Sequence, residues 1–217
     1  MNFTDAYQWI NLRFLLKGLI VTLEVAALTI TFSILLGNLL GILRYLKIPG
    51  FSQLLGLVID TIRNLPLLLI IFFTYFALPR LGVHFNPFWS TIVAMTVFES
   101  CMVSEIIRGG LQAIPLGQTE AGLASAFTPN ETLRYILLPQ AVRQTLPSVV
   151  SQLIALIKDT SLATVITLPE LMHSAQIVYG QNNNYVIPMF MLLALYYFII
   201  CYSLSLFARY LQKRYRY

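Results

Sequence analysis

Three ionisable residues stand within otherwise uncharged apolar stretches: Glu99 in residues 85–104, and Lys158 and Asp159 in residues 144–166. If these stretches cross a membrane, each charge is expensive, because a charged side chain at the bilayer centre costs about 2.5 to 3.5 kcal/mol on insertion scales. Glu99 has no basic neighbour one turn away on its own helix. It is therefore expected to be protonated, to pair with another helix through a side chain such as Lys158, or to face a water-filled cavity. We favour a role in lining a ligand pocket.

Lys158 and Asp159 must also find partners away from their own helix. Adjacent residues on an α-helix point about 100° apart, and this spacing does not favour a side-chain ion pair. Thr160 and Ser161 follow directly, and their hydroxyl groups are suited either to backbone carbonyls or to a polar ligand. These four residues are candidates for a polar lining.

Two further pairs of opposite charge lie three residues apart, Asp60 with Arg63 and Glu105 with Arg108. Residues at this spacing are neighbours on a helix surface and can neutralise each other. Pro66 removes a backbone donor and frees carbonyls about one turn earlier, so it predicts a break or kink after Arg63. The first pair is interpreted either as a structural ion pair at this kink or as part of a pathway lining; for the second pair we favour the structural interpretation.

The elements that must position these residues are membrane-spanning helices. Of the 217 residues, 58% are hydrophobic and 11% are charged, whereas soluble domains carry about a quarter charged residues. This composition excludes a soluble globular protein and a disordered chain. Crossing about 30 Å of hydrocarbon takes roughly 20 helical residues. Five apolar runs qualify, and they predict one all-α integral membrane domain over residues 1–217: 25–43, 64–79 (extended back to 54), 85–104, 144–166 and 185–208.

The basic residues near the ends of these spans predict the orientation of the chain. With the C-terminus inside, nine basic residues face the cytoplasm and three face the outside. The nine are Arg44, Lys47, Arg108, Arg134, Arg143, Arg209, Lys213, Arg214 and Arg216, and the three are Arg13, Lys17 and Arg80. We therefore predict an N-out, C-in topology. Residues 1–24 mix charged and aromatic side chains and favour a short amphipathic lead-in at the outer interface.

Motifs for enzymatic chemistry are missing from the sequence. It contains no GxxxxGK[ST] phosphate loop, no GxGxxG, no HExxH and no GxSxG. Cys101 and Cys201 have no metal-binding spacing, so we expect no bound metal or cofactor. The net charge of +5 is attributed to cytoplasmic loops and not to nucleic-acid binding.

The stretch between the third and fourth spans, residues 109–143, is too rich in Gly, Pro and charge to cross a membrane. A short helix with small side chains is predicted over residues 118–127. A second helix is predicted to begin at Pro129, because Thr128 at the N-cap, Pro129 at the first position and Glu131 at the third form a capping box. The first helix is suited to docking into a groove of another protein, and an ordinary turn between spans is the alternative.

The string EAGLASAF from Glu120 to Phe127, continued by Ile136-Leu137-Leu138-Pro139, resembles a cytoplasmic motif of the permease subunits of ATP-binding-cassette importers. That motif is Glu-Ala-Ala, three residues, Gly, nine residues, Ile, one residue, Leu-Pro. Five positions match: Glu120, Ala121, Ile136, Leu138 and Pro139. Gly122 replaces the third-position Ala and Ala126 replaces the Gly, and each change exchanges one small residue for another. The resemblance implies that this short helix couples the chain to an ATPase.

Other segments resemble the polar amino-acid branch of these permeases, particularly its glutamine and glutamate members. They are Asp60 to Pro66, Phe98-Glu99, Ser104 to Gln112, Leu138 to Ala141 and Lys158 to Leu162. The resemblance implies the type I importer permease fold with five helices, a second permease subunit, identical or paralogous, and two ATPase subunits that bind ATP and Mg²⁺. It also implies a separate extracellular or periplasmic solute-binding protein and a location in the bacterial plasma membrane.

For such a permease, the resemblance places the substrate cavity among the middle helices. The candidate lining residues are Arg63, Asn64, Phe98, Glu99, Lys158, Asp159 and Ser161. We expect Asp159 and Glu99 near the amino group of an amino acid and Arg63 near its carboxylate. Glutamine, glutamate and a basic amino acid are the expected substrates, in that order.

Two other functional classes remain open from the sequence. An ion-coupled secondary transporter would use Glu99 or Asp159 as its ion site, but such proteins often contain internal repeats, and none is visible here. A membrane enzyme or a non-transporting assembly subunit is the third hypothesis. An enzyme would need clustered catalytic groups, whereas the two histidines, His84 and His173, lie far apart in the sequence.

Overall fold

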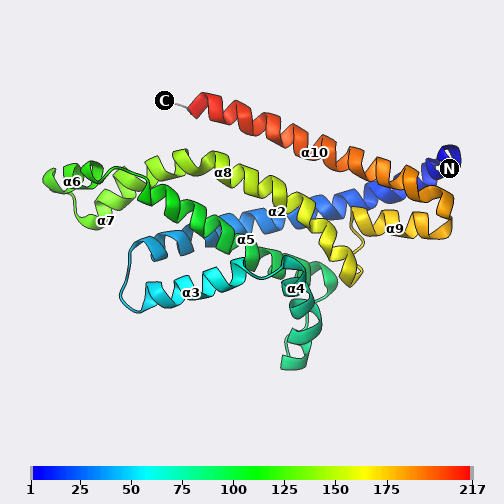
Figure 1. The fold of residues 1–217 in the computed structure, drawn as a ribbon, viewed down its shortest axis with the longest axis horizontal. Helices are drawn as coiled ribbons and strands as arrows, with labels where there is room; N and C mark the ends of the chain where they lie inside the picture. The colour runs from blue at the N-terminus through cyan, green and yellow to red at the C-terminus, as the bar shows by residue number, and fades with distance from the viewer. Residues whose placement is uncertain (1, 216–217) are drawn as a thin grey trace. The chain divides into compact units, whose positions relative to one another are not determined.

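The structure, a computed structural model, describes residues 2–215, with side chains as far as residue 210 (Figure 1). Over these residues the chain consists of helices and short turns without any strand, so the all-α prediction is confirmed. The α-helices are α1 (Phe3–Ala6), α2 (Trp9–Tyr45), α3 (Phe51–Arg63), α4 (Leu67–Phe72), α5 (Pro87–Gln112), α6 (Leu116–Ala124), α7 (Pro129–Glu131), α8 (Leu138–Asp159), α9 (Leu171–Gln181) and α10 (Val186–Tyr215). Residues 73–77 and 132–137 are π-helical, and residues 78–81, 160–166 and 183–185 form 3₁₀ turns.

The number of membrane spans agrees with the prediction. Within the described part of the chain, four helical stretches are long and apolar enough to cross a membrane: Trp9–Tyr45, Pro87–Gln112, Pro129–Ile166 and Asn183–Tyr210. A fifth span results when α3 and residues 67–81 are counted as one interrupted span. Each of the five predicted apolar runs overlaps one of these segments, so the five-span reading of the hydropathy pattern is confirmed.

The N-out, C-in orientation stays a prediction. Three of the basic residues on which it depends, Lys213, Arg214 and Arg216, lie outside the described side chains.

The interruption of the second span occurs where the sequence predicted it. α3 ends at Arg63 and α4 begins at Leu67, after Pro66 in an extended conformation with φ −60° and ψ 130°. Asn64 caps the end of α3, because its backbone N–H donates to the carbonyl of Asp60 at 3.2 Å and its side-chain amide donates to the same oxygen at 2.7 Å. Pro66 lacks the N–H that would reach the carbonyl of Ile62 in a continuous helix, and the backbone N–H of Leu65 donates to that carbonyl instead, at 3.2 Å.

The N-terminal region differs from the prediction. Instead of a separate lead-in before a span at residue 25, α2 begins at Trp9 and continues for 37 residues. Its first half packs against α9: a Cβ on Gly18 would lie 2.3 Å from the Ser174 hydroxyl, and Thr22 accepts a hydrogen bond from the backbone N–H of Leu171 at 3.1 Å. The expected separate lead-in is therefore wrong, because this packing and the lack of a proline keep the segment helical.

Contacts within the chain group the described residues into two compact units. Unit 1 takes residues up to 31, 66–96 and 153–207, and unit 2 takes residues 32–65, 97–152 and those from 208 on. The buried core of unit 1 includes Ala6, Leu15, Leu171, Ala175, Val178, Met189 and Leu193. The core of unit 2 includes Val103, Ile107, Leu111, Ile114, Leu137 and Ala141. The assignment of residues 1–217 to a single domain stays a prediction.

Two glycines bring α2 and α5 close together within unit 2. A Cβ on Gly37 would lie 2.7 Å from the Cβ of Val103, and a Cβ on Gly41 would lie 2.7 Å from the backbone oxygen of Ser104. The four-residue spacing of these glycines therefore serves a helix contact inside the chain, of the kind small residues permit in membranes.

Candidate functional site

The helix that carries the resemblance to the importer motif is α6. It begins after Pro115 and ends at Ala124, three residues before the predicted end. It ends there because Ala126 adopts a left-handed conformation with φ 63°. The backbone N–H of Ser125 donates to Ala121 at 3.0 Å, and that of Phe127 donates to Gly122 at 3.2 Å. These bonds satisfy carbonyls at the end of the helix, as in common C-terminal caps.

The predicted capping box at the next helix is confirmed. The Thr128 hydroxyl accepts a hydrogen bond from the backbone N–H of Glu131 at 3.3 Å, and the Glu131 carboxylate accepts one from the backbone N–H of Thr128 at 2.8 Å. From Pro129 the chain stays helical through residues 132–137 and into α8. The turn between α6 and this long helical stretch is therefore fixed by local hydrogen bonds.

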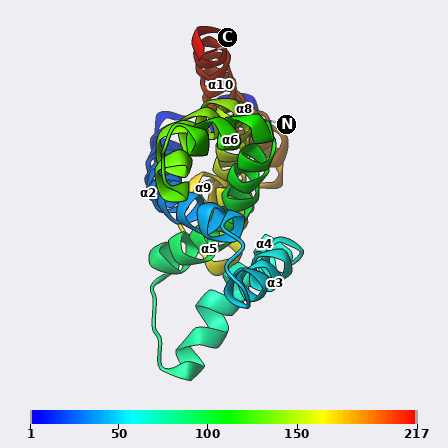
Figure 2. The ribbon, with the colours of Figure 1, turned by 90° about the vertical axis from the view of Figure 1, so that its left-hand side faces the viewer.

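Gly122 and Ile136 of the motif face each other inside the chain. A Cβ on Gly122 would lie 2.7 Å from the Thr132 Cγ2 and 2.9 Å from the Ile136 Cδ1. α6 consequently lies side by side with residues 132–137 (Figures 1 and 2). The small residue expected at position 122 for the approach of another protein instead permits the approach of the chain's own next helical segment.

The outer face of α6 presents a different set of side chains. Leu116, Glu120 and Leu123 share one face through their four- and three-residue spacing, and all three are exposed, Leu116 by 79% and Leu123 by 47%. Ala121 is exposed as well, and Phe127 is 39% exposed after the turn. Of the remaining motif positions, Ala126 and Pro139 are exposed and Leu138 is half-buried. Leu116 and Leu123 were not among the predicted site residues, although their spacing was a signal for them.

Five charged residues form an ionic cluster in unit 2, defined as Arg44, Asp60, Arg63, Glu105 and Arg108. Nitrogen–oxygen distances are 2.8 Å for Arg44–Asp60, 3.5 Å for Arg63–Asp60, 3.7 Å for Arg63–Glu105 and 2.6 Å for Arg108–Glu105, and Arg44 also contacts Glu105. Both predicted three-residue pairs are therefore confirmed. Sequence reasoning missed Arg44, which joins the two pairs by bridging Asp60 and Glu105.

The ionic cluster contains Arg63, a candidate pathway residue, and Asn64, another candidate, follows it in the sequence. Arg63 pairs with both carboxylates, while its Nε atom is buried without a hydrogen-bond partner. Asn64 uses its side-chain amide to cap α3. The structural interpretation of the Asp60–Arg63 pair is thus supported, and a role for Arg63 toward a substrate carboxylate stays a prediction.

Glu99 lies on α5 and its side chain is fully buried in unit 2. It accepts a hydrogen bond from the side-chain amide of Gln152 on α8 at 3.0 Å. Phe98, its neighbour, is half-buried. Gln152 was not among the predicted site residues, because a glutamine in an apolar run carries no charge that would draw attention to it.

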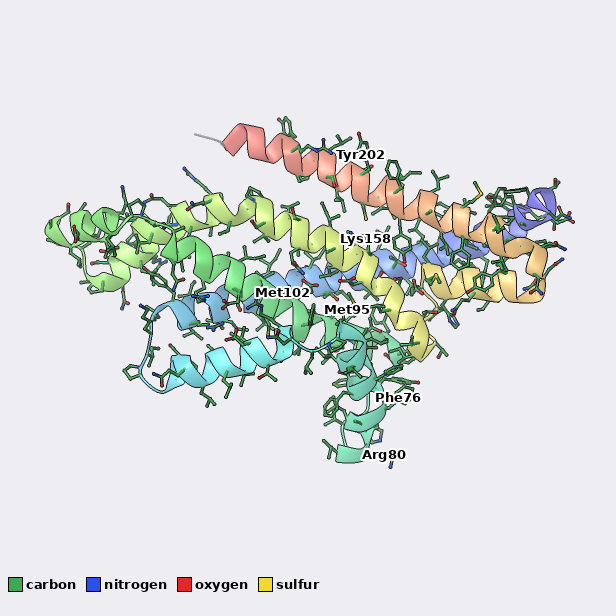
Figure 3. All side chains as sticks on the ribbon, viewed as in Figure 1. Phe76, Arg80, Met95, Met102, Lys158 and Tyr202 are labelled. Carbon is green, nitrogen blue, oxygen red and sulfur yellow. The ribbon has the colours of Figure 1, made fainter. Side chains whose placement is uncertain are left out.

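Lys158, Asp159 and Ser161 belong to unit 1, where α8 passes into the 3₁₀ turn of residues 160–166. Lys158 is exposed near the end of α8 (Figure 3), and Asp159 is half-buried. The Ser161 hydroxyl donates a hydrogen bond to the backbone carbonyl of Lys158 at 2.7 Å. Bonding to a backbone carbonyl was one of the two uses expected for this hydroxyl. The candidate pathway residues are therefore divided between unit 1 and unit 2, and the pairing of Lys158 with Glu99 stays a prediction.

Glu170 is a buried carboxylate that was not among the predicted site residues. Its side chain is fully buried and accepts hydrogen bonds from the backbone N–H groups of Met172 and His173, both at 2.7 Å, at the N-terminus of α9. The Tyr197 hydroxyl donates to it at 3.5 Å. Burial raises the pKa of Glu170 to about 7, although the hydrogen bonds from the backbone of Met172 and His173 oppose this rise.

Comparisons with known proteins agree with this architecture. Residues 33–217 match the family described as binding-protein-dependent transport system inner membrane component. The chain is 52% identical to the probable glutamine ABC transporter permease protein GlnP of Bacillus subtilis (strain 168), with 99% of each chain covered. It is 31% identical to the glutamate/aspartate import permease protein GltK of Escherichia coli O6:H1 (strain CFT073), with 94% of each chain covered.

Solved structures show the same fold. A crystal structure of an amino acid ABC transporter with histidines matches with a TM-score of 0.90 at 27% identity, and 99% of each chain is covered. An inward-facing MetNI methionine ABC transporter matches with a TM-score of 0.75 at 21% identity, over 92% of this chain and 97% of that one, which shows the fold alone. The predicted type I importer permease fold is confirmed. The chain therefore belongs to the family of binding-protein-dependent transport system inner membrane components and is a multi-pass protein of the inner membrane.

Proposed function

We propose that this chain is the permease subunit of an ATP-driven importer for a polar L-amino acid, with glutamine as the first candidate, glutamate as the second and a basic amino acid as the third. The observation that carries the proposal is the 52% identity over 99% of both chains to a probable glutamine permease. The likeness to a glutamate/aspartate import permease supports the second candidate. An arginine transport system permease of Bacillus subtilis at 31% identity supports the third.

In this proposal the chain itself performs no covalent chemistry and binds no cofactor. Two copies of a separate ATPase subunit bind ATP and Mg²⁺, a second permease subunit completes the translocation pathway, and a solute-binding protein delivers the amino acid from outside. The exposed face of α6, which carries Leu116, Glu120 and Leu123, is suited to an ATPase groove, because an amphipathic helix docks through side chains at this spacing.

The packing of α6 supports a route for mechanical coupling. Gly122 lies against Thr132 and Ile136, and the chain continues as a helix from Pro129 through α8. Because closely packed helices move as rigid bodies, a displacement of α6 by closing ATPase subunits is expected to carry residues 132–137 and α8 with it. This motion would switch the spans between inward-open and outward-open states.

The substrate contacts are part of the proposal. We place the amino group of the substrate near Asp159 and Glu99 and its carboxylate near Arg63, because opposite charges compensate the cost of charge within a membrane. Glu99 is fully buried against Gln152, so its contact with a substrate belongs to a different state of the transport cycle. Lys158, Ser161, Asn64 and Phe98 complete the candidate lining.

Reconstitution tests the proposed function. The chain is assembled in proteoliposomes with the ATPase and binding subunits from the same source, and uptake of radiolabelled glutamine, glutamate and arginine is measured with and without ATP. We expect ATP-dependent uptake that is highest for glutamine. Uptake that a proton or sodium gradient drives without ATP would reject the proposal in favour of an ion-coupled transporter.

A further inference from the structure

A pocket of about 330 Å³ opens in unit 2 at the turn between α2 and α3, beside the end of α5. It is lined by Arg44, Lys47, Ile48, Pro49, Ser52, Gln53, Arg108 and Gln112. Three of these residues are cationic and none is a carboxylate. A concave site with this charge favours an anion.

Two of the cations are held in place by the ionic cluster. Arg108 is fixed by Glu105 at 2.6 Å and by the side chain of Gln112 at 2.8 Å, and Arg44 is fixed by Asp60 at 2.8 Å. Their guanidinium groups are therefore positioned before any ligand arrives, which lowers the entropy cost of binding an oxyanion. The two carboxylates of the cluster do not line the pocket.

Lys47 supplies the third cation, and its backbone is in a strained conformation. It follows the end of α2 with φ 51°, in the left-handed region that helix ends usually give to glycine. None of the ion pairs among the described residues includes Lys47. Lys47 is exposed and lines a pocket that has no carboxylate in its wall, and a non-glycine residue in a strained conformation points to a functional role for its side chain.

The surroundings of the pocket indicate the source of the anion. Ile48 and Pro49 form an apolar part of its wall. Phe51, Leu54 and Val58 of α3 are exposed by 49%, 63% and 47%, and their spacing places them on one face of the helix. This apolar face starts beside the basic pocket. The pocket and the face together match a molecule with a charged head and a hydrocarbon tail.

We infer that this pocket binds the phosphate group of an anionic phospholipid, with its acyl chains along the exposed face of α3. Arg44 and Arg108 hold the carboxylates of Asp60 and Glu105 with part of their guanidinium groups, and their remaining N–H groups donate to the phosphate oxygens, while Lys47 adds a point charge. Basic pockets between membrane helices bind lipid headgroups by this chemistry. Inorganic phosphate offers the same oxygens without the tail, so the two sources are separable by experiment.

Lipid titration of the purified full-length chain, followed by native mass spectrometry, tests the inference. The probes are dioleoylphosphatidylglycerol, dioleoylphosphatidylcholine and, in a third series, phosphatidylglycerol with millimolar inorganic phosphate. We expect the first phosphatidylglycerol to bind more tightly than phosphatidylcholine and to resist displacement by phosphate. Lys47→Gln should weaken this first binding about fivefold, since one Lys or Arg near an anionic membrane surface contributes about that factor.

Two further variants decide the interpretation. Lys47→Gly removes the charge while relieving the strained backbone, so it should fold at least as well as the parent and still lose about fivefold in phosphatidylglycerol binding. Arg143→Gln removes an exposed cation of α8 that does not line the pocket and should bind like the parent. Parental phosphatidylglycerol binding by Lys47→Gly, an equal loss in Arg143→Gln, or displacement by inorganic phosphate would each overturn the inference.

Discussion

At the scale of single residues, the turn after α6 contains a residue in an unfavourable backbone conformation. Ala126 has φ 63°, and a side chain with a Cβ pays about 1–2 kcal/mol for the left-handed region. The importer motif that this segment resembles has glycine at the same position. The left-handed conformation therefore explains why the motif has glycine at this position. In this chain Ala126 adopts the same conformation with a loss of stability.

Replacing this alanine should stabilise the protein. We expect Ala126→Gly to raise the free energy of unfolding by about 1 kcal/mol, or Tm by about 2–4 °C for a chain of this length, measured by thermal unfolding in detergent. Ala121→Gly, in the regular part of α6, is the control and should cost about 0.5–1 kcal/mol. Destabilisation by both variants would contradict the strain at residue 126.

Glu170 makes the stability of unit 1 depend on pH. Burial raises its pKa to about 7, above the value of about 4.3 for a free glutamate. Because the folded-state pKa is the higher one, the protonated form stabilises the fold. This contribution is complete below the unfolded pKa and is lost as the pH rises through about 7.

The corresponding measurement is Tm against pH. Between about pH 5 and about pH 8 we expect Tm of the parent to fall, and Glu170→Gln to flatten this dependence because the amide does not titrate. Glu120→Gln, which changes an exposed carboxylate on α6, should keep the parental slope. If Tm of Glu170→Gln fell with pH as steeply as Tm of the parent, groups other than Glu170 would cause the pH dependence.

At the scale of elements, α6 has two faces with different tasks. Gly122 faces residues 132–137, while Leu116, Glu120 and Leu123 face outward. A bulky substitution at Gly122 therefore acts first on the folding of this region. Sequence spacing alone does not separate these effects, because the motif contains both faces within one turn of helix.

Substitutions on the outward face should change partner binding without changing stability. We expect Leu123→Ser to weaken ATPase binding about ten- to a hundredfold, because burial of a leucine side chain contributes about 1.5–3 kcal/mol. Glu120→Lys should also weaken it by reversing the charge. The measurement is co-purification with the ATPase subunit, together with thermal unfolding of the permease alone.

Gly122→Leu and Leu123→Met serve as the comparison for that experiment. Gly122→Leu should lower Tm of the permease alone, because no space exists beside Thr132. Leu123→Met should retain binding, since it conserves volume and hydrophobicity. Normal ATPase binding by both Leu123→Ser and Glu120→Lys would reject the docking role of this face.

At the scale of the whole molecule, the charges within the spans concern transport by the assembled importer. If Asp159 and Glu99 contact the substrate amino group, Asp159→Asn and Glu99→Gln should each reduce kcat/KM for ATP-driven uptake about tenfold or more, because a hydrogen bond to a charged group contributes about 1.5–3 kcal/mol. Uptake is measured in proteoliposomes that contain the complete complex. Asp5→Asn, in α1 and outside the candidate lining, should transport normally, and parental KM and rate in both span variants would reject the proposed contacts.

Most features that the sequence determined by itself depend on local spacing. The five apolar runs, the break at Pro66, the capping box at Thr128 and the three-residue ion pairs of Asp60 and Glu105 all involve neighbours within a few helical turns. Helix periodicity and the thickness of a bilayer fix such features without knowledge of the fold. For this reason the fold class, the break at Pro66 and the capping box were predicted correctly.

Only the tertiary structure decided which distant residues meet. Arg44 joins Asp60 and Glu105 across 16 and 61 positions of sequence, and Gln152 reaches Glu99 across 53 positions. Helix periodicity does not encode such pairings, because they depend on which helices pack together and on their axial register. The same packing turned Gly122 inward and buried Glu170, so that burial, and not residue type alone, set the role of each side chain.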